Sequence, residues 1–356
     1  MTTDTMDPLR SIGFTESVAR GCALLQLDAP TGARAMRVIE VHRDRLLLHD
    51  GERETLAHIP SSLLRTLQPD GGPLAVGDWV LADTERGDTC RVVARMSPLT
   101  QLVRRNAEGR RQCLVSNVDS ALLMMGLDGN HNVRRLERYL ALVQSAGVWP
   151  IVVLSKRDIA PQAGERIDEV RSRIPADVPV HAIDARSAAV GVEFAPYLGP
   201  GQTVVLLGSS GVGKSTLANA LLGRSVQATG EARADDSRGR HTTTARSLHR
   251  LPGGACLIDT PGLRGLQADT DEAGLQASFS DLGALAAHCR FRDCTHREEP
   301  GCAVREQMNP DRLANYRKLM REVQRESMTY LDRRKQLAEW KMRSRSAEQR
   351  MKLKRG

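Results

Sequence analysis

A glycine-rich segment in the middle of the chain has the residue types of a phosphate-binding loop. It reads Gly208-Ser209-Ser210-Gly211-Val212-Gly213-Lys214-Ser215, the pattern G-x-x-x-x-G-K-S. An apolar run over 203–207 precedes it and a helix-forming run over 217–222 follows, as this motif requires. Backbone N–H groups and the helix dipole would then bind phosphate, with Lys214 at the terminal phosphates and Ser215 on Mg²⁺. The candidate nucleotide contacts are Gly208, Ser209, Ser210, Gly211, Val212, Gly213, Lys214, Ser215 and Thr216.

A second phosphate and metal element is predicted downstream, at Asp259-Thr260-Pro261-Gly262. This D-x-x-G sequence ends a short apolar run, so Asp259 would hold Mg²⁺ through water and the Gly262 N–H would contact the γ-phosphate. Between the two elements lies the polar stretch 239–244, which we interpret as a mobile switch. Its Thr243 is the predicted ligand of Mg²⁺ and γ-phosphate. The alternative is a solvated threonine cluster.

The segment that would read the base lies upstream, at Ser155-Lys156-Arg157-Asp158. In the pattern N-K-x-D, the Asp carboxylate accepts two hydrogen bonds from guanine and the Lys stem covers the base. Ser155 replaces the Asn, and its shorter side chain predicts reduced guanine affinity, while Asp158 preserves selectivity against adenine. A further nucleotide element is expected near Asp184-Ala185, although the usual Ser-Ala dipeptide is missing.

The order of these motifs predicts the fold class. The base-reading segment precedes the phosphate loop, whereas an ordinary GTPase has it far downstream, so we expect an α/β, circularly permuted GTPase domain. Leu263 occupies the position where many GTPases have a water-orienting Gln, which predicts slow intrinsic turnover; His241 is the candidate water-positioning group from this chain. Two alternatives stay open: a nucleotide-gated RNA-binding module with negligible hydrolysis, and an ATP enzyme such as a kinase.

Four potential metal ligands cluster near the C-terminal end: Cys289, Cys294, His296 and Cys302. A Cys₃His set completes a tetrahedral shell with no open position, which is typical of structural rather than catalytic zinc. We therefore predict one Zn²⁺ per chain that stabilises a short loop-rich module. The alternative is a group of free thiols beside a surface histidine.

Over residues from about 35 to 330 the sequence resembles the ribosome small subunit-dependent GTPase A family. The resemblance rests on the permuted motif order, on residues 239–244 and 259–264, and on the Cys/His spacing. It implies an N-terminal OB-fold, a C-terminal zinc domain, GTP and GDP as ligands, and the small ribosomal subunit with its rRNA as partner, in late subunit maturation. Ser155, the segment at Asp184 and a long basic tail depart from the family pattern.

Length and composition fit such a protein. The chain has 356 residues, 40% of them hydrophobic, and a net charge of +8. No apolar run approaches membrane-spanning length, and the N-terminus has no signal-peptide pattern. We therefore expect a cytoplasmic monomer that makes no contact with a membrane.

The positive charge is concentrated at the C-terminus. Residues 311–356 contain 15 Lys and Arg against 6 Asp and Glu, a net charge of +9. Leu313, Tyr316, Leu319 and Val323 have helical spacing, which predicts an amphipathic helix against the zinc module. The arginines and lysines beyond about Met342 are interpreted as an rRNA phosphate contact. The alternative is a solvated helix end.

The N-terminal region shows five short strand-like runs, at 35–41, 45–48, 54–59, 79–82 and 90–94. They predict a small β-barrel. The expected division is a disordered segment over 1–16, the barrel over 17–100, the permuted GTPase domain over 101–275, and the zinc-binding, mostly helical domain with its basic tail over 276–356. The stretch 96–109 is expected to be a linker.

Overall fold

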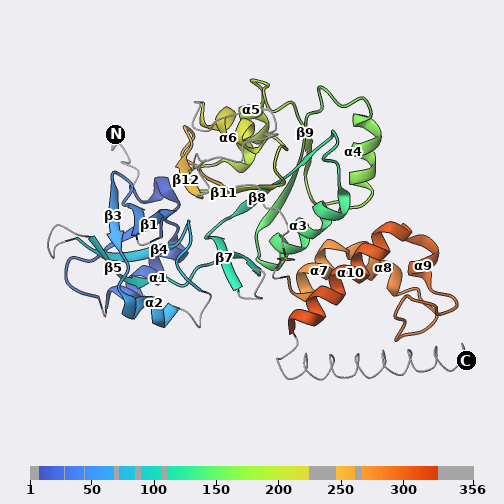
Figure 1. Ribbon diagram of the computed structural model, residues 1–356, viewed down its shortest axis with the longest axis horizontal. Coiled ribbons are helices and arrows are strands. Elements are labelled where there is room, and N and C mark those ends of the chain that lie inside the picture. Colours follow the sequence, from blue (N-terminus) through green and yellow to red (C-terminus); the bar gives the residue numbers. More distant parts are fainter. Residues whose placement is uncertain are drawn as a thin grey trace, which may run out of the picture.

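A computed structural model describes most of the chain. The described stretches are residues 8–27, 29–43, 45–67, 72–84, 90–105, 111–223, 246–260, 267–268 and 270–327. Along them a small barrel, an open α/β sheet and a helical module follow one another from the N-terminal to the C-terminal side (Figure 1). None of the described helices has the length and apolarity needed to cross a membrane.

The predicted barrel is confirmed, with all five strands in place. They are β1 (Arg34–Val41), β2 (Arg45–His49), β3 (Glu54–His58), β4 (Trp79–Asp83) and β5 (Cys90–Arg95). Their order is β1-β2-β3-β5-β4, and β4 also pairs with β1, so the sheet closes on itself. Closure leaves no edge strand to pair with another chain. The interior of the barrel is filled by Val38, Leu46 and Val80. Helix α2 (Ser61–Leu67) lies between β3 and β4 in sequence, and the arrangement is an OB-fold.

The expected disorder over residues 1–16 is wrong for residues 8–16. A 3₁₀ turn, η1 (Arg10–Ile12), leads into α1 (Glu16–Gln26), whose N-cap Thr15 accepts the Val18 N–H. Ile12 is fully buried, and the Phe14 ring lies 5.0 Å from the Trp79 ring. These apolar contacts order the segment, although its sequence shows no helical or strand period. Residues 1–7 lie outside the described part.

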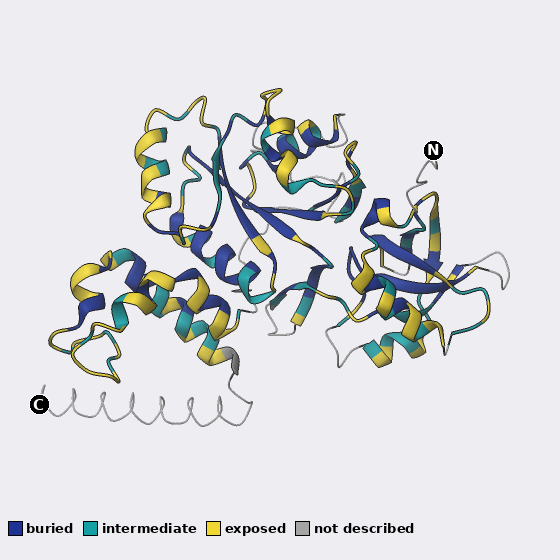
Figure 2. Ribbon diagram, turned by 180° about the vertical axis from the view of Figure 1, so that it is seen from behind, coloured by how far each residue is buried: buried dark blue, intermediate teal, exposed yellow. Residues whose placement is uncertain are grey.

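An open sheet of mainly parallel strands forms the centre of the molecule. Its order is β10-β9-β8-β11-β13-β12, and only β12 runs antiparallel to its neighbour. Both faces of a parallel sheet are covered, and its central strands β8 and β11 are accordingly buried along their whole length (Figure 2). Strand β12 also pairs with β1 through Glu40 and Ser247, which joins the sheet to the barrel. The strands are β8 (Ser120–Gly126), β9 (Trp149–Ser155), β10 (Val180–Ala182), β11 (Thr203–Gly208), β12 (Ser247–Arg250) and β13 (Cys256–Asp259).

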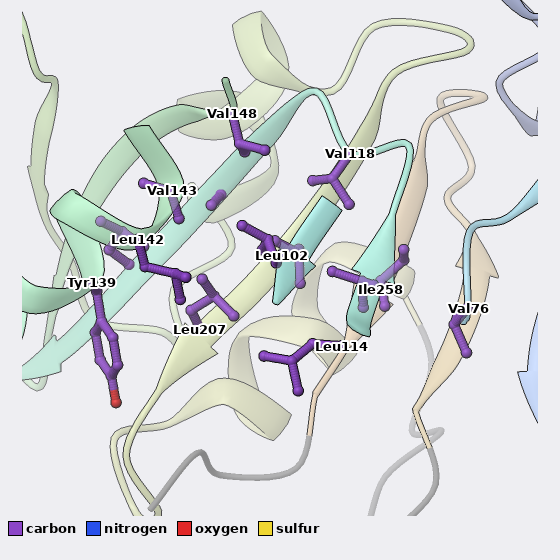
Figure 3. Close-up of a cluster of buried hydrophobic side chains, with 14 of the residues drawn as sticks. Val76, Leu102, Leu114, Val118, Tyr139, Leu142, Val143, Val148, Leu207 and Ile258 are labelled. Atoms are coloured by element: carbon purple, nitrogen blue, oxygen red, sulfur yellow. The ribbon is translucent and has the colours of Figure 1, made fainter. Parts of the chain in front are cut away.

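Helices cover the two faces of this sheet. On one face, α3 (Val133–Ser145) and α4 (Ala163–Arg171) share a core with Leu207 of β11 and Ile258 of β13, and Figure 3 shows Tyr139, Leu142 and Val143 of α3 in the same cluster as these two residues. On the other face, α6 (Lys214–Leu222) and the short α5 (Val190–Phe194), which continues as η2 (Ala195–Tyr197), pack on Leu206 and Leu257. The strands therefore lie between two helical layers, as in a doubly wound α/β fold.

The stretch expected to be a linker contains a strand of the fold at residues 101–105. Strands β6 (Gln101–Arg105) and β7 (Arg111–Ser116) pair antiparallel, and β14 (Gln267–Ala268) joins β6. The hairpin is held because Leu102 and Leu114 are buried in the core shared with α3. The fully buried Arg37 of the barrel also donates to the carbonyls of Asn117, at 2.9 Å, and Ile12.

A helical module follows the sheet and packs on α3. It contains α7 (Glu272–Ser278), α8 (Ser280–Ala286), α9 (Ala303–Gln307) and α10 (Pro310–Ser327), and Leu313 and Leu319 bury the predicted apolar face of α10. The fully buried Glu137 of α3 accepts hydrogen bonds from Arg312, at 2.8 Å, and Arg173, at 3.0 Å. This network ties the module to the α/β layer. The basic tail over 328–356 lies outside the described residues.

Candidate functional site

The phosphate-binding loop has the predicted setting between strand and helix. β11 ends at Gly208, and α6 begins at Lys214 after Gly213, which has φ +92°. A side chain at Gly208 would lie 2.7 Å from the Met124 carbonyl, so only glycine fits there. The loop therefore lies at the carboxyl end of β11, where open α/β sheets bind their ligands.

Lys214 is held inside this loop. Its Nζ donates to the carbonyl oxygens of Gly208, at 3.0 Å, and Ser209, at 2.8 Å. Burial lowers the pKa of Lys214 to about 8, and the negative charge of Asp259 acts in the opposite direction. A bound phosphate would supply further negative charge and favour the protonated ammonium.

Asp259 lies beside the loop, as the sequence predicts. It ends β13, in register with Leu206 of β11, and the next residue, Thr260, donates to the Leu206 carbonyl at 2.6 Å. Ser215 is half-buried in the first turn of α6. The predicted ligands Thr243 and Gly262 and the candidate water-positioning residue His241 lie outside the described residues.

The base-reading loop is joined to the phosphate loop through Ser155. This residue ends β9 and is fully buried, and its Oγ donates to the Val212 carbonyl at 2.6 Å. Although serine is shorter than the asparagine of the N-K-x-D pattern, its hydroxyl reaches the phosphate loop and links the two loops. Lys156 follows in a left-handed conformation with φ +62°.

Asp158 lies next to the segment at Asp184. The Arg157 N–H donates to the Ile183 carbonyl at 3.2 Å, which brings the ends of β9 and β10 together. Arg157, Asp158, Asp184 and Ser187 contribute to the lining of a hollow of about 380 Å³ at this edge. The Asp158 side chain is exposed there and available to a ligand.

The four Cys/His residues form a compact cluster after α8. Their ligand atoms all lie within 4.8 Å of one another. His296 Nδ1 is 3.6 Å from Cys289 Sγ and 3.5 Å from Cys302 Sγ, and the two sulfurs are 3.9 Å apart. A tetrahedral ion with sulfur and nitrogen ligands requires edges of about 3.8 Å between sulfurs and about 3.6 Å between sulfur and nitrogen. Cys289, His296 and Cys302 have this spacing, and the four residues together could hold a metal ion.

Comparisons with known proteins agree with this geometry. Residues 96–269 match the RsgA GTPase family. A "Small ribosomal subunit biogenesis GTPase RsgA" from Xylella fastidiosa (strain M12) is 44% identical over 300 residues, covering 82% of this chain and 88% of the relative. A protein of the same name from Xanthomonas oryzae pv. oryzae (strain MAFF 311018) is 42% identical over 296 residues, covering 81% of this chain and 80% of the relative.

The chain belongs to the RsgA GTPase family.

Two solved structures share its fold. The crystal structure of YjeQ from Thermotoga maritima has a TM-score of 0.60 at 22% identity, covering 82% of this chain and 98% of that one. The structure of YloQ, described as a circularly permuted GTPase, has a TM-score of 0.57 at 20% identity, covering 84% and 98%. The predicted fold class of this RsgA-family chain is thereby confirmed.

The sequence reasoning missed a third loop of the candidate site. Residues 127–132 follow β8, which lies between β9 and β11 in the sheet. Asp128 Oδ2 accepts a hydrogen bond from Lys156 Nζ at 2.7 Å, and Arg166 donates to the Asp128 carbonyl at 3.0 Å. The available signal was the Asp-Gly-Asn turn just after the apolar run over 121–125, since carboxyl ends of parallel strands meet at one edge.

Removing the Ser155 hydroxyl is expected to weaken nucleotide binding in this RsgA-family protein. Ser155→Ala leaves the buried Val212 carbonyl without that donor and frees the base loop from the phosphate loop. We expect GDP affinity to fall about tenfold, measured by calorimetry. Ser116→Ala is the matched control, because this buried hydroxyl bonds Asp78 at the barrel instead. Equal GDP affinity in both variants would contradict the assigned role.

Proposed function

We propose that this protein is a Mg²⁺-dependent GTPase that binds the small ribosomal subunit and assists its late maturation. The observation that carries the proposal is the 2.6 Å hydrogen bond from Ser155 Oγ to the Val212 carbonyl. It joins the loop of Asp158 to the loop of Lys214, so that one guanine nucleotide can contact both. The names of the relatives from Xylella and Xanthomonas support the assignment to small-subunit biogenesis.

The chemistry assigned to the phosphate side is charge stabilisation. Lys214 and the N-terminal N–H groups of α6 would bind phosphate oxygens, and the Gly262 N–H would contact the γ-phosphate. Ser215, Thr243 and Asp259 would hold Mg²⁺. When bound, Mg²⁺ neutralises the charge that develops on the transferring phosphoryl group. The Lys214 ammonium is already anchored on the loop carbonyls, so it needs little reorganisation to neutralise the same charge.

The assigned hydrolysis is slow without a partner. Leu263 follows Gly262 and cannot hydrogen-bond the attacking water. His241, or a group of the ribosome, positions the water instead. We therefore expect low basal turnover and stimulation by the small subunit. The protein is assigned to the cytoplasm, as a monomer.

The Cys/His cluster is assigned to one structural Zn²⁺. Four ligands leave no open position for substrate, and the distances among Cys289, His296 and Cys302 support tetrahedral coordination. The loop between Cys289 and Cys294 exposes Arg290 and Arg292, which are suited to phosphate contacts with rRNA. The arginines and lysines beyond residue 342 are assigned to the same partner.

Exchange of the base-reading carboxylate should switch nucleotide preference. Asp158→Asn replaces two acceptor contacts to guanine with a mismatched pair and should cost about 2 to 4 kcal/mol of GDP affinity. Binding of xanthosine diphosphate should improve, because the xanthine C2 oxygen then faces an amide donor. Competition titrations with GDP, XDP and ADP measure both effects.

The control for this exchange is Asp168→Asn, which removes an acidic side chain from the surface of α4. It should keep the wild-type preference for GDP. Wild-type GDP affinity in Asp158→Asn would show that Asp158 does not read the base. Equal competition by ADP in the wild type would instead favour an ATP enzyme.

A further inference from the structure

A carboxylate at the end of β8 contacts the lysine of the base-reading loop. Asp128 Oδ2 accepts a hydrogen bond from Lys156 Nζ at 2.7 Å, and the two side chains are 29% and 28% exposed. The other oxygen of Asp128 accepts the Asn130 N–H at 3.1 Å. Because both oxygens are engaged, the carboxylate has a defined orientation.

The backbone beneath this pair is also fixed. The Leu127 N–H donates to the Ser155 carbonyl at 2.9 Å, so the loops after β8 and β9 are joined directly. Arg166 of α4 donates to the carbonyls of Leu127 and Asp128. Lys156 itself has φ +62°, a conformation that the surroundings must hold in place for a residue with a Cβ.

The pair lies between the two halves of the nucleotide site. Strand β8 separates β9, which carries the base loop, from β11, which carries the phosphate loop. Lys156 therefore extends from the base loop toward the phosphate loop to reach Asp128. The side chain of Asn130, in the same turn, lies close to the phosphate loop. Its Nδ2 is 3.8 Å from the position that a Cβ atom on Gly211 would occupy.

We propose that Asp128 is a positioning residue for guanine recognition: it anchors the Lys156 ammonium so that the aliphatic stem of this lysine is ordered to cover the base. This inference rests on the proposed guanine site. A free lysine stem loses rotamer freedom when it stacks on a ligand, whereas a stem already held by an ion pair does not. Anchoring the stem therefore strengthens nucleotide binding, although Asp128 itself does not contact the nucleotide.

The charge of Asp128 persists at neutral pH. Partial burial raises the pKa of this carboxyl, but the hydrogen bonds from Lys156 and the Asn130 N–H outweigh it and hold the pKa below its usual range. The ammonium of Lys156 therefore faces a carboxylate under the conditions of a binding assay.

The test is a set of titrations of the full chain with mant-GDP, a fluorescent GDP. Asp128→Asn keeps the shape and an acceptor for Asn130 but removes the charge, and we expect its dissociation constant to rise about threefold to tenfold. In a Lys156→Met background, Asp128→Asn should change the dissociation constant less than about twofold, because the ammonium that Asp128 anchors is absent. Asp177→Asn, an exposed acidic residue of the same layer, should bind as the wild type does.

Each other outcome overturns the inference. An equal loss of mant-GDP affinity in the wild-type and Lys156→Met backgrounds would mean that Asp128 only supports the loop. Higher affinity in Asp128→Asn would mean that the ligand must break the pair. Unchanged affinity would mean that the pair is irrelevant to binding. A wild type that does not bind mant-GDP, or one whose affinity survives Asp158→Asn, would remove the guanine site itself.

Discussion

Ser215→Ala is expected to lower GTP turnover about a hundredfold or more while leaving the fold intact. The hydroxyl lies in the first turn of α6, directly after Lys214, and its assigned role is to hold Mg²⁺. Without that ligand, Mg²⁺ no longer stabilises the charge on the transferring phosphoryl group, a loss of several kcal/mol in barrier lowering. Phosphate release at saturating GTP and Mg²⁺ measures the effect.

A surface hydroxyl supplies the control for this prediction. Ser172→Ala removes a side chain that bonds the Glu169 carbonyl at the end of α4. It should retain wild-type turnover. If a folded Ser215→Ala protein hydrolyses GTP at the wild-type rate, the assignment of the phosphate loop to catalysis is wrong.

Cys294→Ala is expected to abolish metal binding and unfold the loop over residues 288–302. Structural zinc contributes about 10 kcal/mol or more of apparent binding free energy at pH 7, and this short loop buries little apolar surface of its own. Helices α7 and α10 should stay on α3, because Glu137 and Arg312 hold them independently of the metal. GDP affinity should therefore stay at the wild-type value.

Metal analysis and local proteolysis measure these effects. Wild-type protein should contain one equivalent of zinc per chain, and Cys294→Ala should contain none and be cleaved within the loop. The control Cys113→Ala removes a buried thiol of β7 that is not part of the Cys/His cluster. Zinc below about half an equivalent in the wild type, with no further loss in Cys294→Ala, would contradict a zinc site.

The sequence predicted the parts of the molecule whose residue types are dictated by backbone geometry or ligand chemistry. The glycines of the phosphate loop and the five alternating strands of the barrel are of this kind. The Cys₃His spacing also predicted a compact cluster, because only a shared ion brings such residues together in so short a stretch.

Contacts between distant segments were not predictable in the same way. Whether Ser155 could link the two nucleotide loops depended on the distance to Val212, which no local pattern encodes. The order of residues 8–16 depends on Trp79, far along the chain, and the Asp128–Lys156 pair depends on the sheet order. Sequence patterns predict elements, whereas these contacts follow from how the elements pack.

The most direct test of the central proposal is the rate of GTP hydrolysis as purified small ribosomal subunits are added. The account predicts slow turnover of the protein alone and a rise of about tenfold or more at saturating subunits, because an outside group positions the water in place of Leu263. Large subunits should have no such effect. If small subunits bind the protein but leave the rate unchanged, including in single turnover, the chain is a nucleotide-gated RNA-binding module instead.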